Sequence, residues 1–394
     1  MLQKLIKQSA KYFIGLAFGK VLSTITFILL ARALLTQGFG TFTLFITLIQ
    51  VITFFGDIGL NQWYQKHADH ENKKNVLHKL LFLRLLTLII SIAIGFVTFT
   101  FSTLPSQLLV IFLLTLIPEA FLSALDGFYL ERRQSFVVSF KTVSKTLILL
   151  CGYIVYTQTF SVEIAIYFYA LSSLLTALWY FPWSALKDMI IPTKQELVQV
   201  IKETYAYAFL IVTSFAYSRG DALVIGYTVG TAALGTYGAA YRYLDTLSLI
   251  PTALAHNLFS ISAKKTGVSY KQLLSITALM TGIGCIVSTT LYLCANLLTV
   301  QLLGKDYILA VPLVQIFAGV VLLFFINSPL STVVQSSRFV TAFLPFGFIN
   351  TAANIILNLI FIPIYGLQAA AWIMFGTELT GLIINLYFVK KIYN

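Results

Sequence analysis

Long apolar runs separated by short polar stretches dominate the chain. A helix of about 20 residues, rising about 1.5 Å per residue, crosses an apolar layer about 30 Å thick. Only helices and closed barrels satisfy their backbone groups in lipid, so these unbroken runs predict transmembrane α-helices. Twelve spans are predicted, at residues 12–35, 39–62, 79–101, 108–129, 140–156, 164–182, 205–228, 233–256, 272–295, 307–330, 341–363 and 366–389.

Residues 31–60 show the pattern most clearly. They hold the end of the first span, a turn predicted at Gly38, Phe39 and Gly40, and most of the second span. Arg32 falls at the far end of the first crossing, and Asp57 falls near the end of the second, on the side where the chain began. A charge at bilayer depth costs about 2.5 to 3.5 kcal/mol on insertion scales, so both charges need an explanation.

The longest polar connection joins spans six and seven and divides the chain. It predicts an N-terminal six-helix lobe at residues 1–190, a cytoplasmic linker at 191–204 and a C-terminal six-helix lobe at 205–394. The sequence KQELVQVIKE in this connection is amphipathic and suits a helix lying on the membrane surface.

A short internal repeat supports the division into halves. The sequence GFGTFTLF around Gly40 has a counterpart in ALGTYGAAY around Gly235, and the two glycines lie 195 residues apart in a chain of 394. Because six spans is an even number, the two copies are expected to cross the membrane in the same direction, as parallel repeats do.

Composition excludes an ordinary soluble domain. Of the residues, 58% are hydrophobic and 10% are charged, whereas soluble domains have about 25% charged residues. The formal net charge of +12 comes from short loops, which is the positive-inside pattern and gives no indication of nucleic-acid binding.

The placement of the 26 Lys and Arg residues predicts the orientation. Twenty, among them Lys141 and Lys145, are counted on the side of the termini, and only Lys305 falls on the opposite side. The other five lie within spans. Both termini are therefore expected in the cytoplasm. The first span is expected to stay as an anchor, because no cleavage pattern follows it.

Sequence signatures of enzymes are not found. The chain has no Gly-rich phosphate loop, no paired metal-ligand spacing and no nucleophile elbow. We therefore expect neither catalytic residues nor a metal or organic cofactor, and the only ions in prospect are protons or Na⁺ used for coupling.

Charged residues within the spans are the candidates for function. Arg84, about one turn inside span three, is expected to extend its guanidinium to the interface. Lys20 lies deeper, about 13 Å past the cytoplasmic edge, which favours a polar cavity or an acidic partner. Arg32 and Asp57 fit an interfacial anchor and a cavity role equally well.

Spans seven and eight carry the densest polar group. At helical spacing, Tyr241, Arg242 and Asp245 share one face of span eight. Arg242 and Asp245 either neutralise each other or serve a binding site. Arg219 and Asp221, two residues apart, point to different faces, so at least one should face a polar space. The group consists of Tyr217, Arg219, Asp221, Tyr237, Tyr241, Arg242 and Asp245.

Two glutamates fall near the middle of their spans, Glu119 in span four and Glu378 in span twelve. Glu119 follows Pro118, which removes a backbone donor and locally opens the helix. Either carboxyl group could be protonated and silent or could bind a coupling cation.

Three stretches carry a family resemblance: LIKQSAKYFIGLAFGKVLSTITFILLARALLTQGFGTFTLF at 5–45, FFGDIGL at 54–60 and AALGTYGAAYRYLDTLSLIPTALAHNLFS at 232–260. In these the chain resembles the bacterial polysaccharide flippases, which translocate O-antigen or capsule repeat units. They belong to the multidrug/oligosaccharidyl-lipid/polysaccharide exporter superfamily. The resemblance covers the whole chain.

The resemblance implies an all-α polytopic membrane protein, with about 12 transmembrane helices in two six-helix lobes around a central cavity. It implies a flippase of the bacterial cytoplasmic membrane that moves undecaprenyl-pyrophosphate-linked oligosaccharide from the cytoplasmic to the outer leaflet by alternating access. Membrane lipids, a polysaccharide polymerase and chain-length proteins are the other implied partners.

The same resemblance assigns roles to the charged residues. Lys20, Arg32, Arg219 and Arg242 would bind the pyrophosphate, because basic side chains, and the permanently charged Arg above all, contact phosphate groups well. Tyr217 and Tyr241 would stack on sugar rings. The ion-coupling candidates are Asp57, Glu119, Asp245 and Glu378.

Three other functions stay open at this point. An ion-coupled drug antiporter of the same superfamily should favour acidic cavity residues, whereas this chain places basic residues at depth. The peptidoglycan-precursor flippase typically has 14 spans. An integral-membrane polysaccharide polymerase needs an extramembrane catalytic loop, and the longest predicted outer loop is 296–306.

Overall fold

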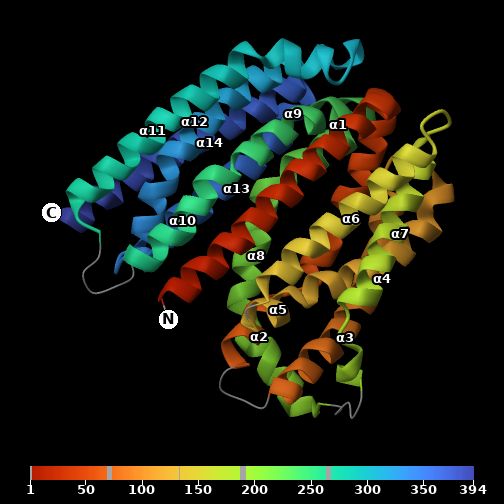
Figure 1. Ribbon diagram of the computed structural model, residues 1–394, viewed down its shortest axis with the longest axis horizontal. Coiled ribbons are helices and arrows are strands. Elements are labelled where there is room, and N and C mark those ends of the chain that lie inside the picture. The colour runs from red at the N-terminus through yellow and green to blue at the C-terminus, as the bar shows by residue number, and fades with distance from the viewer. Residues whose placement is uncertain (1, 69–72, 133, 187–191, 263–267) are drawn as a thin grey trace. The chain divides into compact units, whose positions relative to one another are not determined.

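All regular structure in the described part of the chain is helical (Figure 1). The computed structural model describes residues 2–68, 73–132, 134–186, 192–262 and 268–394. The α-helices are α1 (Leu2–Phe55), α2 (Leu60–His67), α3 (Lys73–Thr100), α4 (Leu109–Ala124), α5 (Asp126–Glu131), α6 (Ser135–Val155), α7 (Val162–Tyr180), α8 (Lys194–Thr228), α9 (Thr231–Leu247), α10 (Leu249–Ser262), α11 (Tyr270–Leu293), α12 (Ala310–Gln335), α13 (Val340–Tyr365) and α14 (Leu367–Tyr393). Short 3₁₀ or π segments are η1 (Ser106–Leu108), η2 (Trp183–Leu186), η3 (Leu297–Gln301) and η4 (Lys305–Tyr307).

The prediction of an all-α polytopic membrane fold is confirmed. Within the described residues, nine helices are long and apolar enough to cross a membrane. The first of the nine, in α1, contains two predicted spans. The predicted spans 205–228 and 233–256 lie outside the nine, in α8 and in α9 with α10. Each of the twelve predicted spans thus has a helical counterpart.

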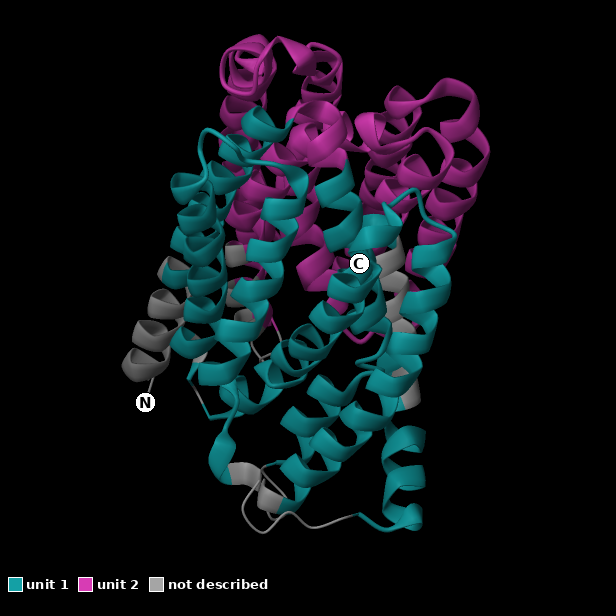
Figure 2. Ribbon diagram, turned by 90° about the vertical axis from the view of Figure 1, so that its right-hand side faces the viewer, with its two compact units in different colours: residues 1–34, 41–219 teal, residues 35–40, 220–394 magenta. Residues whose placement is uncertain are grey.

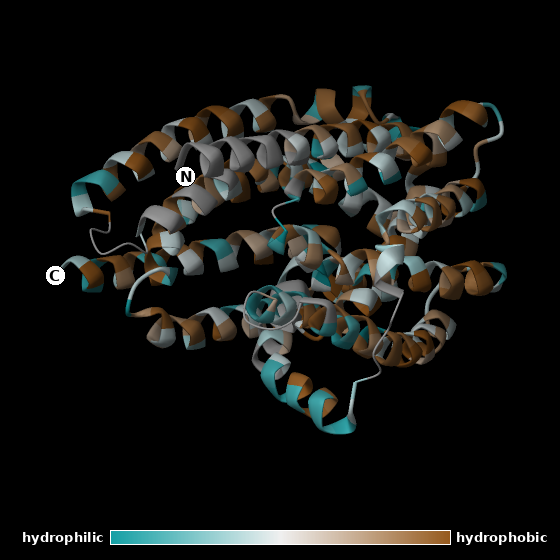
Figure 3. Ribbon diagram, turned by 60° about the horizontal axis from the view of Figure 1, so that its bottom comes forward, coloured by the Kyte–Doolittle hydropathy of each residue, from teal (hydrophilic) through white to brown (hydrophobic). Residues whose placement is uncertain are grey.

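Large apolar side chains are exposed along these helices, as expected where lipid is the solvent. Ile89, Ile286 and Leu293 are each about two-thirds exposed or more, at 67%, 70% and 74%. Figure 3 shows apolar residues along the long helices, with hydrophilic residues concentrated toward helix ends and connections. This distribution agrees with a bundle that meets lipid on its outer surfaces.

The predicted turn at Gly38, Phe39 and Gly40 is wrong. The chain breaks at Leu35, which has φ 54° and ψ −177°, and Gly38 to Gly40 are already helical. Gly40 serves a different purpose, because a Cβ atom there would lie 1.7 Å from the carbonyl oxygen of Thr231. The glycine allows two backbones to approach closely.

The two glycines of the internal repeat lie against each other. A Cβ atom on Gly235 would lie 1.9 Å from the carbonyl oxygen of Thr36, and one on Gly40 would meet Thr231 in the same way. Thr36 and Thr231 are also 195 residues apart, like the two glycines. The contact is therefore reciprocal between the repeats, as a local two-fold axis requires. Small residues that let helices approach closely are typical of membrane interfaces.

The chain divides into two compact units (Figure 2). Unit 1 comprises residues 1–34 and 41–219, and unit 2 comprises residues 35–40 and 220–394. The Gly40 and Gly235 contact thus lies within unit 2. The predicted lobe boundary at residue 205 falls inside α8, a continuous helix of 35 residues whose first part belongs to unit 1.

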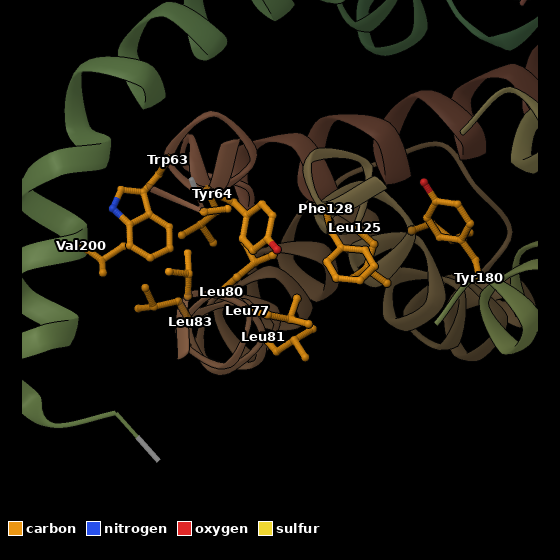
Figure 4. Close-up of a cluster of buried hydrophobic side chains, with 14 residues drawn as sticks. Trp63, Tyr64, Leu77, Leu80, Leu81, Leu83, Leu125, Phe128, Tyr180 and Val200 are labelled. Atoms are coloured by element: carbon orange, nitrogen blue, oxygen red, sulfur yellow. The ribbon is translucent and has the colours of Figure 1, made fainter. Parts of the chain in front are cut away.

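The stretch KQELVQVIKE was expected to form a helix lying on the membrane surface. It forms the first turns of α8 and packs against other helices of unit 1. Val200 is buried with Trp63 in a cluster of apolar side chains (Figure 4). The indole Nε1 of Trp63 donates a hydrogen bond of 2.8 Å to Glu203, and Lys79 pairs with Glu196 at 3.3 Å. Burial would raise the pKa of Glu203, but the hydrogen bonds from Trp63 and Gln199 hold it below its usual value.

The glycine crossing predicts unequal effects of Gly to Ala substitutions. Gly40→Ala and Gly235→Ala should each destabilise the purified protein, by about 1 to 3 kcal/mol, because the added methyl group pushes two backbones apart. Gly282→Ala in α11 is the matched control, since a Cβ atom there meets nothing within 4 Å. Thermal unfolding in detergent measures all three. Equal midpoints for the three variants would contradict the close crossing.

Candidate functional site

Arg84 is a buried cation at the centre of unit 1, and the prediction that it extends to the interface is wrong. Its side chain is 1% exposed. Nε donates to the carbonyl oxygen of Ala120 at 2.8 Å, and Nη2 donates to the carbonyl oxygen of Thr53 at 2.8 Å and to the hydroxyl of Ser123 at 2.6 Å. Arg84 therefore ties α1, α3 and α4 together.

Asp57 lies beside this arginine, in the turn between α1 and α2, and is 5% exposed. Its Oδ1 accepts a hydrogen bond of 2.9 Å from Asn61, whose amide also donates to the carbonyl oxygen of Ser123 at 2.7 Å. The Oδ1 of Asn61 accepts from the backbone N–H of Gly127 at 2.7 Å. Asp57 of FFGDIGL and Asn61, which follows the motif, thus close a junction between α1, α2, α4 and α5.

The backbone of this motif makes room for the junction. Ile58 and Gly59 have positive φ angles of 42° and 82°, which reverse the chain between α1 and α2. A Cβ atom on Gly56 would lie 2.6 Å from the hydroxyl of Ser91 and 3.1 Å from Nη1 of Arg84. We refer to Arg84, Asp57 and Asn61 together as the buried junction. Within it Asp57 has an internal partner, and the coupling role of Asp57 stays a prediction.

Glu119 is paired inside unit 1. Lys145 on α6 donates a short hydrogen bond to its carboxylate, and the hydroxyl of Ser173 on α7 donates at 2.5 Å. The ammonium of Lys145 also lies 4.8 Å from the centroid of the Tyr169 ring. The sequence analysis counted Lys145 among the charges of the cytoplasmic side, and the residue lies inside α6.

A second ion pair of the same kind lies one turn earlier on α6. Lys141 donates to Asp126 at 2.5 Å and lies 5.3 Å from the centroid of the Tyr180 ring. The hydroxyl of Tyr180 donates to Asp126 at 2.7 Å. Each ion pair thus combines a lysine from α6, a carboxylate from α4 or α5, and a ring and a hydroxyl from α7.

The acidic residue Asp221 is held inside unit 2. It is 7% exposed and accepts a short hydrogen bond from the hydroxyl of Tyr237, which connects α8 to α9. Tyr237, Tyr241 and Phe317 form an aromatic cluster, in which Tyr241 lies 5.9 Å from Tyr237 and 6.0 Å from Phe317 between ring centroids. The cluster places Tyr241 at the edge of a packed core.

Arg242 follows Tyr241 and stays partly exposed. Its Nη1 lies 3.8 Å from Oδ2 of Asp245, and the two side chains are 23% and 22% exposed. A separation near the limit for an ion pair, at partly exposed groups, gives weak mutual neutralisation. Lys20, Tyr217 and Arg219 are also partly exposed, and Arg32 is exposed.

Glu378 belongs to a group of amide side chains in unit 2. Nδ2 of Asn327 donates to its carboxylate at 3.1 Å, and Asn385 donates to Asn327 at 3.2 Å. Asn354 donates to Thr377 at 3.1 Å, and Asn358 donates to Asn354 at 2.9 Å. In the described residues, the amide oxygens of Asn358 and Asn385 are buried without a hydrogen-bond partner.

Sequence reasoning missed several of these residues for identifiable reasons. Lys145 was counted only as a cytoplasmic-side charge, although Lys141 and Lys145 are spaced to share one helix face within a predicted span. The amides Asn327, Asn358 and Asn385 are uncharged, so a search for charges inside spans passed over them. Polar amides within apolar runs were the signal that could have identified them.

Removal of the buried cation should destabilise unit 1. Arg84→Met leaves the carbonyl oxygens of Thr53 and Ala120 without their donor and leaves Asp57 beside no cation, at a cost of about 3 to 5 kcal/mol. The double variant Arg84→Met/Asp57→Asn should recover part of that loss, since it removes both charges. The exposed Arg32→Met is the control. The thermal unfolding midpoints of all variants test these expected changes in stability. An Arg84→Met variant as stable as wild type would contradict the role given to the buried junction.

Solved structures of membrane transporters share this fold. The lipid II flippase MurJ in an inward closed conformation matches with a TM-score of 0.79 and 14% identity, covering 96% of this chain and 87% of that one. An inward-facing multidrug resistance MATE family transporter matches with a TM-score of 0.73 and 13% identity, covering 97% of each chain. A transporter of the MOP superfamily from Pyrococcus furiosus matches with a TM-score of 0.63 and 16% identity, covering 98% of this chain and 95% of that one.

A search of curated protein sequences found no match. The family model described as "Polysaccharide biosynthesis protein" matches residues 5–259, which is more than half of the chain. Together with a fold that the transporters above share, this match identifies the protein as a member of the polysaccharide biosynthesis protein family.

Proposed function

We propose that the protein is a flippase that moves an undecaprenyl-pyrophosphate-linked oligosaccharide from the cytoplasmic to the outer leaflet of the bacterial cytoplasmic membrane. The product would supply O-antigen, capsule or exopolysaccharide synthesis. Membership of the polysaccharide biosynthesis protein family supports a glycolipid substrate, and the shared fold with the lipid II flippase MurJ supports translocation.

The observation that carries the proposal is the exposed surface of four basic residues on the transmembrane helices. The acids Asp57, Glu119 and Asp221 make internal hydrogen bonds, to Asn61, Lys145 and Tyr237. The basic residues Lys20, Arg32, Arg219 and Arg242 on the transmembrane helices keep exposed surface. Exposed cations on spans suit an anionic ligand, and the pyrophosphate is the most concentrated negative charge of the proposed substrate.

In this proposal Arg219, Arg242, Lys20 and Arg32 bind the pyrophosphate, and arginine is well suited because its planar guanidinium binds phosphate oxygens in pairs. Tyr217 and Tyr241 would contact the sugars, and the edge position of Tyr241 in its aromatic cluster leaves part of its surface accessible. The polyprenyl chain would stay in lipid while alternating access carries the headgroup across a central cavity.

Coupling to H⁺ or Na⁺ is proposed to use a carboxylate. Glu378 is the first choice among Asp57, Glu119, Asp245 and Glu378, because it lies in a group of amides that includes two buried oxygens without hydrogen-bond partners. Amide and carboxylate oxygens are suitable ligands for small hard cations. Both termini would lie in the cytoplasm, and a polymerase and chain-length proteins would act on the product.

The drug antiporter is the second candidate, since a multidrug transporter shares the fold. A cationic drug would need acidic residues at its binding site, and two of the acids, Asp57 and Asp221, are buried with internal hydrogen-bond partners. A polysaccharide polymerase is a weaker candidate, because the described connections between helices are too short to hold a catalytic domain.

The proposed function predicts that Arg219→Ala and Arg242→Ala each reduce glycolipid translocation at least tenfold. The reason is the loss of a charge-assisted contact to the pyrophosphate, worth about 1.5 to 3 kcal/mol. The assay measures leaflet translocation of a pyrophosphate-linked oligosaccharide by purified protein in liposomes. Arg338→Ala, an exposed arginine between α12 and α13, is the matched control and should be as active as wild type.

Two results would overturn the proposal. The first is that wild-type protein moves no glycolipid and instead exports organic cations against an ion gradient, which would favour the antiporter. Alternatively, both arginine variants could translocate at the wild-type rate, which would remove the anion-binding role. Equal folding of the variants is checked by their thermal unfolding midpoints.

A further inference from the structure

The ammonium of Lys145 lies among ligands that come from two other helices. Glu119 on α4 accepts its hydrogen bond, and the face of Tyr169 on α7 lies 4.8 Å away. Ser173, also on α7, donates to the same Glu119 oxygen at 2.5 Å. A carboxylate and an aromatic face at one positive charge, with a hydroxyl bonded to the same carboxylate oxygen, are groups that bind a small monovalent cation.

The second ion pair shows that this arrangement is not accidental. Lys141 contacts Asp126, and the ring and hydroxyl of Tyr180 take the places of Tyr169 and Ser173. The carboxylates of the two pairs differ in exposure, because the side chain of Asp126 is 32% exposed and that of Glu119 is 15% exposed. The deeper pair therefore depends more on its own counter-ion.

We propose that Lys145 is a tethered cation that permanently fills a monovalent-cation site formed by Glu119, Ser173 and Tyr169. The site holds a covalently attached ammonium where a freely diffusing ion would otherwise bind. Unit 1 consequently takes up no coupling ion at Glu119. Under the proposed function, on which this consequence rests, ion coupling then has to use a carboxylate elsewhere in the chain.

Removing the tether should convert the site into one for a soluble cation. Lys145→Ala leaves Glu119 uncompensated next to a space the size of a lysine side chain. A ligand that binds only the folded state stabilises it in proportion to its concentration and affinity. Methylammonium carries the same charged group, and Na⁺ is a smaller monovalent cation, so either should stabilise the variant.

The experiment measures the thermal unfolding midpoint of the full chain in lipid nanodiscs. Solutions of choline, sodium and methylammonium chloride are compared at equal ionic strength, since choline is too bulky for the site. We expect Lys145→Ala to unfold at a lower temperature than wild type in choline and to recover with methylammonium or Na⁺, with saturation. Lys145→Ala/Glu119→Gln should lose at least tenfold in apparent affinity for the cation. Lys141→Ala, at the more hydrated pair, is the matched control and should respond less.

Wild-type protein supplies a test that does not depend on the folding of the Lys145 variants. Its midpoint should be the same in all three salts, because its cation is already bound. Saturable stabilisation of wild type by Na⁺ that Glu119→Gln abolishes would overturn the proposal. An identical response of Lys145→Ala and the double variant to every salt would do so too. Glycolipid is absent from these measurements, so their failure is distinct from failure of the proposed flippase function.

Discussion

A charge inside a helix bundle in lipid has to be compensated by the protein itself, because the surrounding solvent offers no hydrogen bonds. The buried arginine Arg84 illustrates the constraint, since three protein oxygens accept its hydrogen bonds and Asp57 lies beside it. Two of these acceptors are main-chain carbonyl groups near the ends of α1 and α4. The charge thus stabilises the places where helices are interrupted, and the interruption of α1 is where FFGDIGL lies.

Helix association in lipid relies on close packing and polar contacts, because apolar surfaces gain little by leaving lipid for one another. The chain uses both. Gly40 and Gly235 allow backbone contact within unit 2, and the paired Lys141 and Lys145 link α6 to α4, α5 and α7 within unit 1. Several polar side chains within the spans thereby link helices, and Lys20, Arg32, Arg219 and Arg242 keep exposed surface.

The spans could be predicted from the sequence because hydropathy over about 20 residues responds directly to the lipid environment. Details that depend on tertiary contacts could not be predicted from the sequence. The glycines near residue 40 suggested a turn, but their small size serves a helix crossing with Thr231, and the break falls at Leu35. Arg84 was predicted to reach the interface because it lies about one turn inside its predicted span. That position carries no information on the carbonyl groups that neighbouring helices offer.

The candidate site, like the fold, was predictable except where it depends on tertiary contacts. The sequence identified the charged residues within spans, yet it could not separate those with internal partners from those with exposed surface. Glu119 and Lys145 are 26 residues apart and meet only because α4 and α6 are packed with α7 between them in unit 1. The exposed surface of Arg32, Arg219 and Arg242 is the feature on which the proposed anionic substrate rests.

The most direct test of this account is the headgroup selectivity of the wild-type protein. Liposomes would carry one oligosaccharide attached to the same polyprenyl chain either through pyrophosphate or through an uncharged linkage, and translocation of the two lipids would be compared at low and high ionic strength. The account predicts rapid movement of the pyrophosphate-linked lipid only, with a rate that falls as salt screens the charges. Equal translocation of both lipids, without salt dependence, would contradict the claim that exposed basic residues select an anionic glycolipid.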